Sequence, residues 1–369
     1  MSAPLGEKLK AVKWGKFKVG DLFEILSYKK RFDANKVHIT KTGHPYIVRT
    51  SVNNGLKGYL KENEAYLNEG NTISFGQDTA TMFYQEKPYF TGDKIKILKP
   101  KNKNFNKLNA MFFIAEMSKA FSTFSWGNSS FSITAISEQQ FRLPVTNENE
   151  IDFSFMETFI RELEEERIRE LAAYLTASGL TDYHLTPPEI DIIYQFDKTV
   201  WGTFNLEELY GKSTRGKRLK SADRIPGKLI FVTAGEANEG ISAYIGNHVE
   251  IFSKNTTTID MFGSAKYRNY EYGADDHVAV VHTENLPKYA SIFVTSAIHK
   301  AAHTGKFSYA KNFYAKDADE LNISLPIKDG APDYTFMATF TRAVQKLVIK
   351  NVVRYSEEKL ASAKQIVIR

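Results

Sequence analysis

The feature that most constrains this chain is a long helical pattern that occurs twice. Residues 152–179 read DFSFMETFIRELEEERIRELAAYLTASG, and residues 333–363 read DYTFMATFTRAVQKLVIKNVVRYSEEKLASA. When Asp152 is aligned with Asp333, a Phe-Met pair, a threonine, a second phenylalanine and an arginine coincide. Apolar residues recur at steps of three, four and seven in both segments, which predicts two amphipathic helices. Each helix therefore has a long apolar stripe to bury.

The ends of these helices carry capping signals. Ser154 and Glu157 have the spacing of a capping box, and Gly179 suits a left-handed helix end. In the second copy Thr335 is available as a cap but Ala338 replaces the glutamate, so we expect a weaker start. A helix of about 27 residues is roughly 40 Å long. We expect the two helices to form an antiparallel pair, and the alternative is that each packs only on its own domain.

The remainder of the chain repeats as well. Trp14 opens the segment WGKFKVGDLFEI, and Trp201 opens WGTFNLEELYGK. Each half continues through a basic stretch, an apolar strand, an Asn/Gly loop, a probable helix and a strand that ends in Leu-Pro. Short alternating runs between turn residues indicate an α+β domain in each half. We therefore predict a first domain at 1–150, a long helix at 151–180, a linker at 181–199, a second domain at 200–331 and a second long helix at 332–369.

Composition limits the class of protein. The chain has 369 residues, 42% of them hydrophobic, and no cysteine. That length suffices for two domains with separate cores, and the absence of cysteine excludes disulfides and thiolate metal sites. No apolar run reaches the length of a bilayer span, and the first residues lack the apolar core of a signal peptide. We expect a cytoplasmic protein that does not associate with membranes.

Motifs for catalysis are missing from the sequence. The segment 211–213, Gly-Lys-Ser, resembles the end of a phosphate-binding loop, but Leu206 stands where that motif needs glycine. Asp333, Glu357 and Lys359 have the residue types of a magnesium-dependent nuclease, yet the last two are expected on the solvated face of a helix. The histidines lack paired metal-ligand spacing, and no nucleophile elbow occurs. We predict no catalytic residue, no metal site and no cofactor bound by this chain.

Basic residues are concentrated in equivalent loops of the two halves. The net charge is +6, a mild preference for polyanions that decides nothing alone. Cations in flexible loops suit phosphate contacts, and the candidates are Lys29, Lys30, Arg31, Lys36 and Lys41 in the first half and Lys212, Arg215, Lys217, Arg218, Lys220 and Arg224 in the second. Base edges are read by arginine, amide and carboxylate groups on firmer backbone, and the candidates are Arg49, Asn53, Asn54, Gln77 and Asp78, with Glu236, Asn238, Lys306 and Asn312. A charge run is usually only a solvated loop, but its repetition favours DNA binding.

These motifs together resemble the specificity subunits of type I and related type IIB restriction-modification systems. The two Trp-Gly openings, the Leu-Pro strand ends and the paired FMETFIRELEEE and FMATFTRAVQKL helices carry the resemblance over nearly the whole chain. It implies two target-recognition domains, similar to the DNA-reading domain of the TaqI adenine methyltransferase, joined by an antiparallel coiled coil. It further implies a non-catalytic subunit that reads a bipartite, asymmetric site in double-stranded DNA, with one half-site per domain.

The resemblance also implies partners. Methylation subunits, typically two, would bring S-adenosylmethionine, and a restriction subunit could join. The predicted surface for the helix pair or a partner comprises Phe155, Met156, Phe159, Arg161, Leu163, Glu165 and Arg169 on the first helix, and Phe336, Met337, Phe340, Arg342, Val344 and Lys346 on the second. For the charged members of this set, a plain solvated face is the alternative. A duplicated-domain enzyme such as a nuclease, or a protein-binding scaffold, are the alternative functions.

Overall fold

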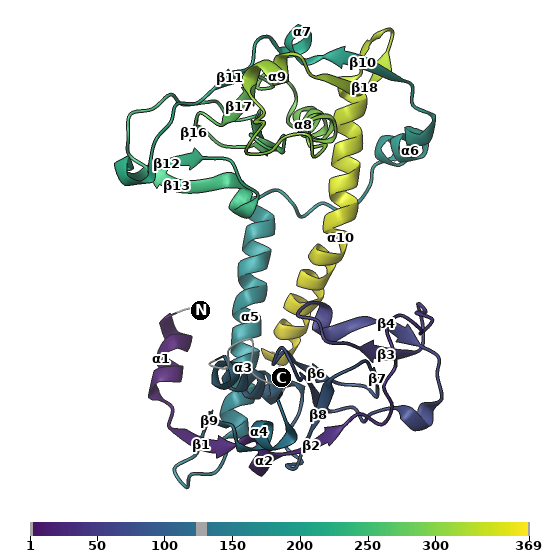
Figure 1. Ribbon diagram of the computed structural model, residues 1–369, viewed down its shortest axis with the longest axis vertical. Coiled ribbons are helices and arrows are strands. Elements are labelled where there is room, and N and C mark those ends of the chain that lie inside the picture. The colour runs from purple at the N-terminus through teal and green to yellow at the C-terminus, as the bar shows by residue number, and fades with distance from the viewer. Residues whose placement is uncertain (1–2, 123–130, 368–369) are drawn as a thin grey trace. The chain divides into compact units, whose positions relative to one another are not determined.

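The computed structural model describes residues 3–122 and 131–367, with side chains described up to residue 362. It divides into two compact units, one comprising Met1–Ala173 and Lys359–Arg369 and the other comprising Tyr174–Glu358. Each unit contains one of the two repeated domains and mixes helices with strands (Figure 1). The α+β class predicted from the sequence is confirmed. Within the described residues, no helix is both long and apolar enough to cross a membrane.

The first domain is built from two larger sheets and one strand pair. Their strand orders are β2-β8-β5-β6, β4-β3-β7 and β1-β9, and only β3 and β7 run parallel. The elements are α1 (Ala3–Ala11), β1 (Trp14–Lys18), α2 (Val19–Leu22), β2 (Phe23–Ser27), β3 (His44–Ile47), β4 (Leu56–Leu60), β5 (Thr72–Gly76), β6 (Met82–Gln85), β7 (Phe90–Thr91), β8 (Ile95–Pro100), α3 (Lys107–Phe121), α4 (Ile133–Glu138) and β9 (Gln140–Pro144).

The second domain repeats this arrangement. Its strand orders are β11-β17-β14-β15, β13-β12-β16 and β10-β18-β19, and β12 and β16 form the parallel pair. The elements are β10 (Trp201–Asn205), α7 (Leu206–Tyr210), β11 (Thr214–Arg215), β12 (Pro226–Val232), β13 (Ile241–Ile245), β14 (Thr256–Asp260), β15 (Ala265–Arg268), β16 (Tyr272–Ala274), β17 (Val278–Val281), α8 (Lys288–Ala302), α9 (Ala315–Asp319), β18 (Asn322–Lys328) and β19 (Ala331–Pro332). The repeat seen in the sequence is therefore a repeat of strand order.

The two motifs that open and close each domain are strand partners. Gly15 in β1 pairs with Leu143 in β9, and Gly202 in β10 pairs with Leu325 in β18, both antiparallel. A Cβ atom on Gly15 would lie 2.6 Å from Cγ1 of Val145, so that any larger residue would force the Val145 side chain to shift. The same steric limit recurs at Gly202. The Trp-Gly and Leu-Pro motifs recur because they build one contact twice.

Each long helix begins inside the core of its own domain. Met156 is fully buried and the Phe159 ring lies 5.4 Å from that of Phe112 in α3, while Phe155 and Leu163 pack at the edge of the same core. The start of α5 beside α3 and β9 is visible in Figure 1.

The second long helix is anchored in the same way. Met337 is fully buried in the core of its domain, and Phe340 stacks on Phe196 at 4.4 Å and on Phe336 at 6.1 Å. Met156, Phe159 and Met337 are therefore core residues, which corrects their assignment to a helix-pair or partner surface. Their burial leaves no surface for another chain to contact.

Both long helices are capped by aspartate. An Asp152 carboxylate oxygen accepts the Phe155 N–H at 2.8 Å at the start of α5 (Phe153–Ala177). An Asp333 oxygen accepts the Phe336 N–H at 2.8 Å at the start of α10 (Tyr334–Val367). The prediction that Ser154 and Thr335 are the caps was wrong, and equivalent aspartate caps remove the reason for expecting a weaker second start.

Glu157, the expected reciprocal partner in the first helix, binds elsewhere. Its carboxylate accepts a hydrogen bond from Asn106 Nδ2 at 2.6 Å, which ties α5 to the start of α3.

The predicted end of the first long helix is confirmed. Gly179 has a φ of 67°, and the Leu180 N–H reaches back to the Leu175 carbonyl at 2.8 Å, the bond that closes a Schellman motif.

The segment predicted as a linker contains a helix. α6 (Pro187–Gln195) begins with proline in its first turn, and a Glu189 oxygen accepts the Thr186 N–H at 2.8 Å. Lys346 of α10 ties this segment down, since its Nζ lies 3.1 Å from Glu189, 2.7 Å from Asp182 and 2.8 Å from the His184 carbonyl. Lys346 is therefore an internal contact of the second unit and not a partner surface.

The aspartate caps can be tested against the rejected serine cap. We expect Asp152→Ala to lower the free energy of unfolding by about 1 kcal/mol, because it leaves the first-turn N–H groups without an acceptor. Ser154→Ala is the matched control and should cost less than about 0.5 kcal/mol. Urea unfolding followed by circular dichroism measures both. A larger loss for Ser154→Ala than for Asp152→Ala would contradict the assignment.

Candidate nucleic-acid interface

The basic stretch of the first domain docks on β7. The Phe32 N–H donates to the Thr91 carbonyl at 3.0 Å, and the Arg31 guanidinium lies 3.8 Å from the Asp93 carboxylate. Lys30 extends over the rings of Phe32 and Tyr66, with its Nζ 5.0 and 4.5 Å from their centroids. Lys29, Lys36 and Lys41 are exposed on the same stretch. The predicted cations thus lie on a loop whose base is fixed to the sheet.

A second group of charged side chains lies at the ends of three strands. Arg49 follows β3, Asp78 follows β5 and Lys94 precedes β8. An Asp78 carboxylate oxygen accepts hydrogen bonds from both Arg49 Nη1 and Lys94 Nζ, the latter at 2.9 Å. The structure therefore brings together Arg49 and Asp78, which were predicted as separate base-reading candidates. Lys94 is not among the residues predicted from the sequence, because a lysine next to a strand is a common surface residue.

Asn53 and Asn54 stabilise a left-handed loop. Asn53, Asn54 and Gly55 all have positive φ, of 50°, 55° and 77°. Asn53 Nδ2 donates to the Leu56 carbonyl at 3.0 Å, and Asn54 Nδ2 donates to the Tyr84 carbonyl at 3.3 Å. Asparagine tolerates the left-handed region better than most residues, so these bonds explain its presence. Both amide groups already have a partner within the domain.

The second domain contains the same loop. Asn238, Glu239 and Gly240 have φ values of 48°, 55° and 77°, and Asn238 Nδ2 donates to the Ile241 carbonyl at 3.4 Å. Gly240 cannot carry a side chain, because a Cβ atom there would lie 2.6 Å from the Thr233 carbonyl oxygen. The repeated Asn-x-Gly signal in the sequence therefore marks a repeated backbone shape.

The basic loop of the second domain combines free cations with one structural arginine. Lys212, Lys217, Arg218 and Lys220 are exposed, as is Arg215 in β11, and within the described residues none of the five forms an ion pair. Arg224 differs from them. Its guanidinium donates to the Leu219 carbonyl at 3.3 and 3.4 Å and lies over the Phe231 ring at 5.1 Å. Arg224 therefore holds the loop together from within.

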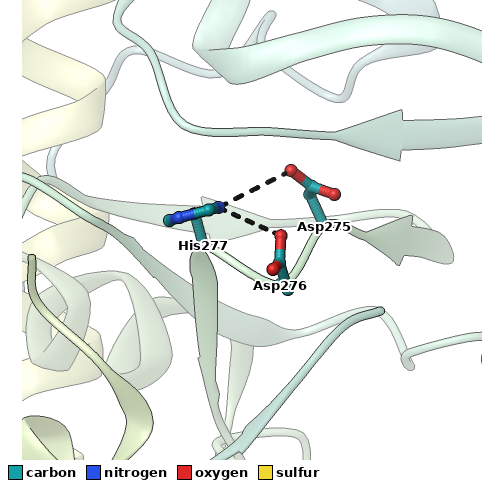
Figure 2. A group of neighbouring side chains, drawn as sticks. All are labelled: Asp275, Asp276 and His277. Carbon is teal, nitrogen blue, oxygen red and sulfur yellow. Dashed lines mark hydrogen bonds and ion pairs between the residues drawn. The ribbon is translucent and has the colours of Figure 1, made fainter. Parts of the chain in front are cut away.

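The turn before β17 anchors this loop. An Asp275 carboxylate oxygen accepts the Leu219 N–H at 3.2 Å. Figure 2 shows Asp275 and Asp276 facing His277, whose Nδ1 lies 4.0 and 3.0 Å from their respective oxygens. The ligand atoms of these three residues lie within 4.8 Å of one another. The backbone bond of Asp275 and the imidazole contacts account for the group as an anchor, and we infer no metal site from it.

The remaining candidates of the second domain are scattered. Lys306 is exposed, and Asn312 Nδ2 donates to the Tyr314 hydroxyl at 3.3 Å. Glu236 lies 3.4 Å from Lys266, and the hydrogen bond from Ser264 is the main cause that holds the pKa of Glu236 below its usual value. The structure does not join these residues to the basic loop.

Among the remaining charged candidates, those on the long helices have local partners. Arg161 lies 4.0 Å from Glu157 and Arg169 lies 3.6 Å from Glu165, both one turn apart on α5. Arg342 lies over the Tyr289 ring at 5.1 Å. Exposed pairs of this kind contribute little to stability, so they leave these side chains available for other contacts.

Comparison with known proteins gives this architecture a family. The family described as "Type I restriction modification DNA specificity domain" matches residues 11–173 and 199–354, which together span both domains and most of both long helices. The chain belongs to this family. A DNA-specificity subunit is the non-catalytic component of a restriction-modification system, so neither the nuclease-like enzyme nor the scaffold is favoured as an alternative.

Two similar proteins cover nearly the whole specificity subunit. The "Type II restriction enzyme BgcI specificity subunit S.BcgI" of Heyndrickxia coagulans is 26% identical over 92% of this chain and 96% of its own length. The type I restriction-modification S subunit from M. genitalium is 16% identical, covers 96% of this chain and 94% of its own, and superposes with a TM-score of 0.59. The second likeness shows a shared fold.

Proposed function

We propose that this specificity subunit reads a bipartite site in double-stranded DNA, with one half-site bound by each domain. The observation that carries the proposal is the repeated placement of the basic stretch. In the first domain it docks on Thr91 at the end of β7, and in the second the Gly216 backbone lies against Ala274 at the end of β16, so closely that only glycine fits. Two equivalent cationic loops on equivalent strand ends suit two contacts with one duplex.

The two kinds of side chain have different proposed roles. The free cations of the basic loops suit phosphate contacts, which supply affinity without sequence information. Side chains held at the strand ends, such as Arg49, suit contacts with base edges in the major groove. Because the side chains at these ends differ between the two domains, the two half-sites are expected to differ in sequence.

We further propose that α5 and α10 pair antiparallel and set the distance between the half-sites. Apolar side chains on α10 support this, since Val344, Leu347, Val348 and Val352 retain substantial exposed surface. An apolar stripe of this length on a charged helix is the usual signature of a helix partner. A strut of roughly 40 Å corresponds to about 12 base pairs of duplex, or about one helical turn.

The chemistry is assigned to partners. We propose that methylation subunits, two in number to match the internal repeat, dock on the long helices and adjoining domain faces and bring S-adenosylmethionine with them. The exposed charges of Arg161, Arg169 and Arg342 are the proposed contact points on the helices. A restriction subunit could join the same assembly. The chain itself is proposed to bind no cofactor.

The reader-only role is tested by methylation assays. The purified chain, a cognate methylation subunit and their mixture are each incubated with unmethylated double-stranded DNA and labelled S-adenosylmethionine. We expect sequence-specific transfer only from the mixture, because recognition and chemistry reside on different chains. Methyl transfer by the purified chain alone would contradict the proposal.

The phosphate role of the basic loop is tested by salt dependence. The double variant Lys217→Gln/Lys220→Gln, assembled with the methylation subunit, should bind specific and random duplexes more weakly by the same factor. The slope of log affinity against log salt should fall in magnitude by about 1.8 for two lost contacts. Lys328→Gln/Lys350→Gln is the charge-matched control and should leave the slope unchanged. Equal slopes for the two double variants would refute the assignment.

The helix pair is tested by distance measurements on a chain that has no native cysteine. Spin labels on cysteines at positions 161 and 354 should be closer together than labels at positions 161 and 342. In an antiparallel pair the start of one helix lies near the end of the other, so the distance shortens along α10. Electron paramagnetic resonance measures both distances, and the reverse order would exclude an antiparallel pair.

A further inference from the structure

The Arg49 guanidinium is only partly used by the protein. Its Nη1 donates to Asp78, and within the described residues Arg49 has no other hydrogen bond or ion pair. Nη2 and Nε thus have no partner in the part of the chain that the structure describes. The Arg49 side chain is 34% exposed and that of Asp78 is 23% exposed, so the pair lies at the surface with the carboxylate the deeper member. One nitrogen of the guanidinium is held by Asp78, and about a third of the side chain is open to solvent.

This arrangement suits a base edge better than a phosphate. A phosphate contact depends on net positive charge, and the Asp78 carboxylate offsets one of the two positive charges of Arg49 and Lys94. Reading a base requires instead that the guanidinium plane be fixed before contact, since guanine presents two acceptors, O6 and N7, in one plane. Asp78 supplies that fixation. Lys94 shares the same Asp78 oxygen at 2.9 Å and offsets its charge.

The comparison with Arg31 sharpens the distinction. Arg31 lies 3.8 Å from Asp93, beyond hydrogen-bond distance, and both side chains are about half exposed. A loosely paired, exposed arginine on the docked basic stretch is free to follow a phosphate. In the first domain, therefore, Arg49 is held by a hydrogen bond to a carboxylate, whereas Arg31 is only loosely paired.

The second domain has no counterpart of the Arg49–Asp78 pair, although its backbone at this position is the same. The Val48 N–H bonds to the Gly55 carbonyl at 2.8 Å, and the Thr233 N–H bonds to the Gly240 carbonyl at 2.8 Å, which makes Ala234 the counterpart of Arg49. Two domains that read different half-sites must differ at the positions that touch bases. The Arg49–Asp78 pair meets this requirement, because the equivalent position in the second domain is Ala234.

We infer that Arg49, positioned by Asp78, reads a guanine of the first half-site through the major groove. This inference rests on the proposed function and names one base for one domain. Asp78 is a positioning residue, because it acts on the base through the arginine. The amides of Asn53, Asn54 and Gln77 are less suited to this role, since each already donates within the domain.

The experiment uses the full chain assembled with its methylation subunit. Methylome sequencing of the host first defines the recognised site. Affinity is then measured for duplexes in which each base pair of both half-sites is replaced in turn, at fixed salt. In a second series 7-deazaguanine, which lacks the N7 acceptor, replaces each guanine of the site.

For the native complex we expect one guanine position in one half-site at which 7-deazaguanine weakens binding roughly 10-fold or more. Arg49→Ala and Arg49→Lys should remove the preference for guanine at that position, by roughly 10- to 100-fold, and leave the other positions unchanged. In either variant 7-deazaguanine should cause no further loss there. Arg49→Lys retains the charge, so its loss of preference cannot be attributed to phosphate affinity, and unchanged preferences at the other positions exclude misfolding.

Asp78→Asn should weaken the same preference and no other, which a purely structural role would not produce. Arg31→Ala is the matched control and should weaken binding to all sequences by one factor. If Arg49→Lys keeps every base preference, the inference is wrong while the proposed function stands. If the native complex shows no sequence preference at all, the proposed function itself fails.

Discussion

The structure depends on the antiparallel pairing of the first strand of each domain with a strand near the end of that domain. β1 with β9 and β10 with β18 bring the two ends of a domain side by side, with Gly15 and Gly202 packed closely against the Val145 and Ile327 side chains. The chain therefore leaves each domain next to where it entered, and the long helix follows directly. Asp152 and Asp333 then cap the two long helices. Their own N–H groups donate to the Pro144 carbonyl in β9 and the Pro326 carbonyl in β18.

The two domains share their buried core contacts but differ in the side chains at the ends of their strands. The buried Thr72 and Tyr89 hydroxyls lie 3.1 Å apart in one domain, and those of Thr256 and Tyr272 lie 2.9 Å apart in the other. Burial raises the pKa of both tyrosines, so both remain neutral hydrogen-bonding groups. At the strand ends the side chains differ: Arg49 in the first domain corresponds to Ala234 in the second. A specificity subunit needs this division, because folding tolerates little change in the core and recognition requires change at the surface.

Several local predictions failed for one physical reason. Ser154 and Asp152 are both good helix caps, and only the backbone path from β9 decides which side chain reaches the first turn. Lys346 looks like any surface lysine in an amphipathic pattern, and its burial depends on the segment 182–189, which is distant in sequence. The base-reading role of Asn53 and Asn54 stays a prediction, and the structure adds that their amides close a left-handed loop. In each case a polar side chain has several suitable partners, and tertiary contacts select one.

The amino-acid sequence by itself determined the internal repeat, the α+β class, the two long helices and the family, because apolar periodicity and recurring motifs are local signals. It also determined which loops are basic. Only the tertiary structure decided which polar residues are free and which are engaged: that Arg224 is held inside its loop, that Met156 and Met337 belong to domain cores, and that Arg49 meets Asp78. Arg49 and Asp78, for example, follow two different strands, and the distance between strand ends is set by the folded sheet rather than by spacing along the chain.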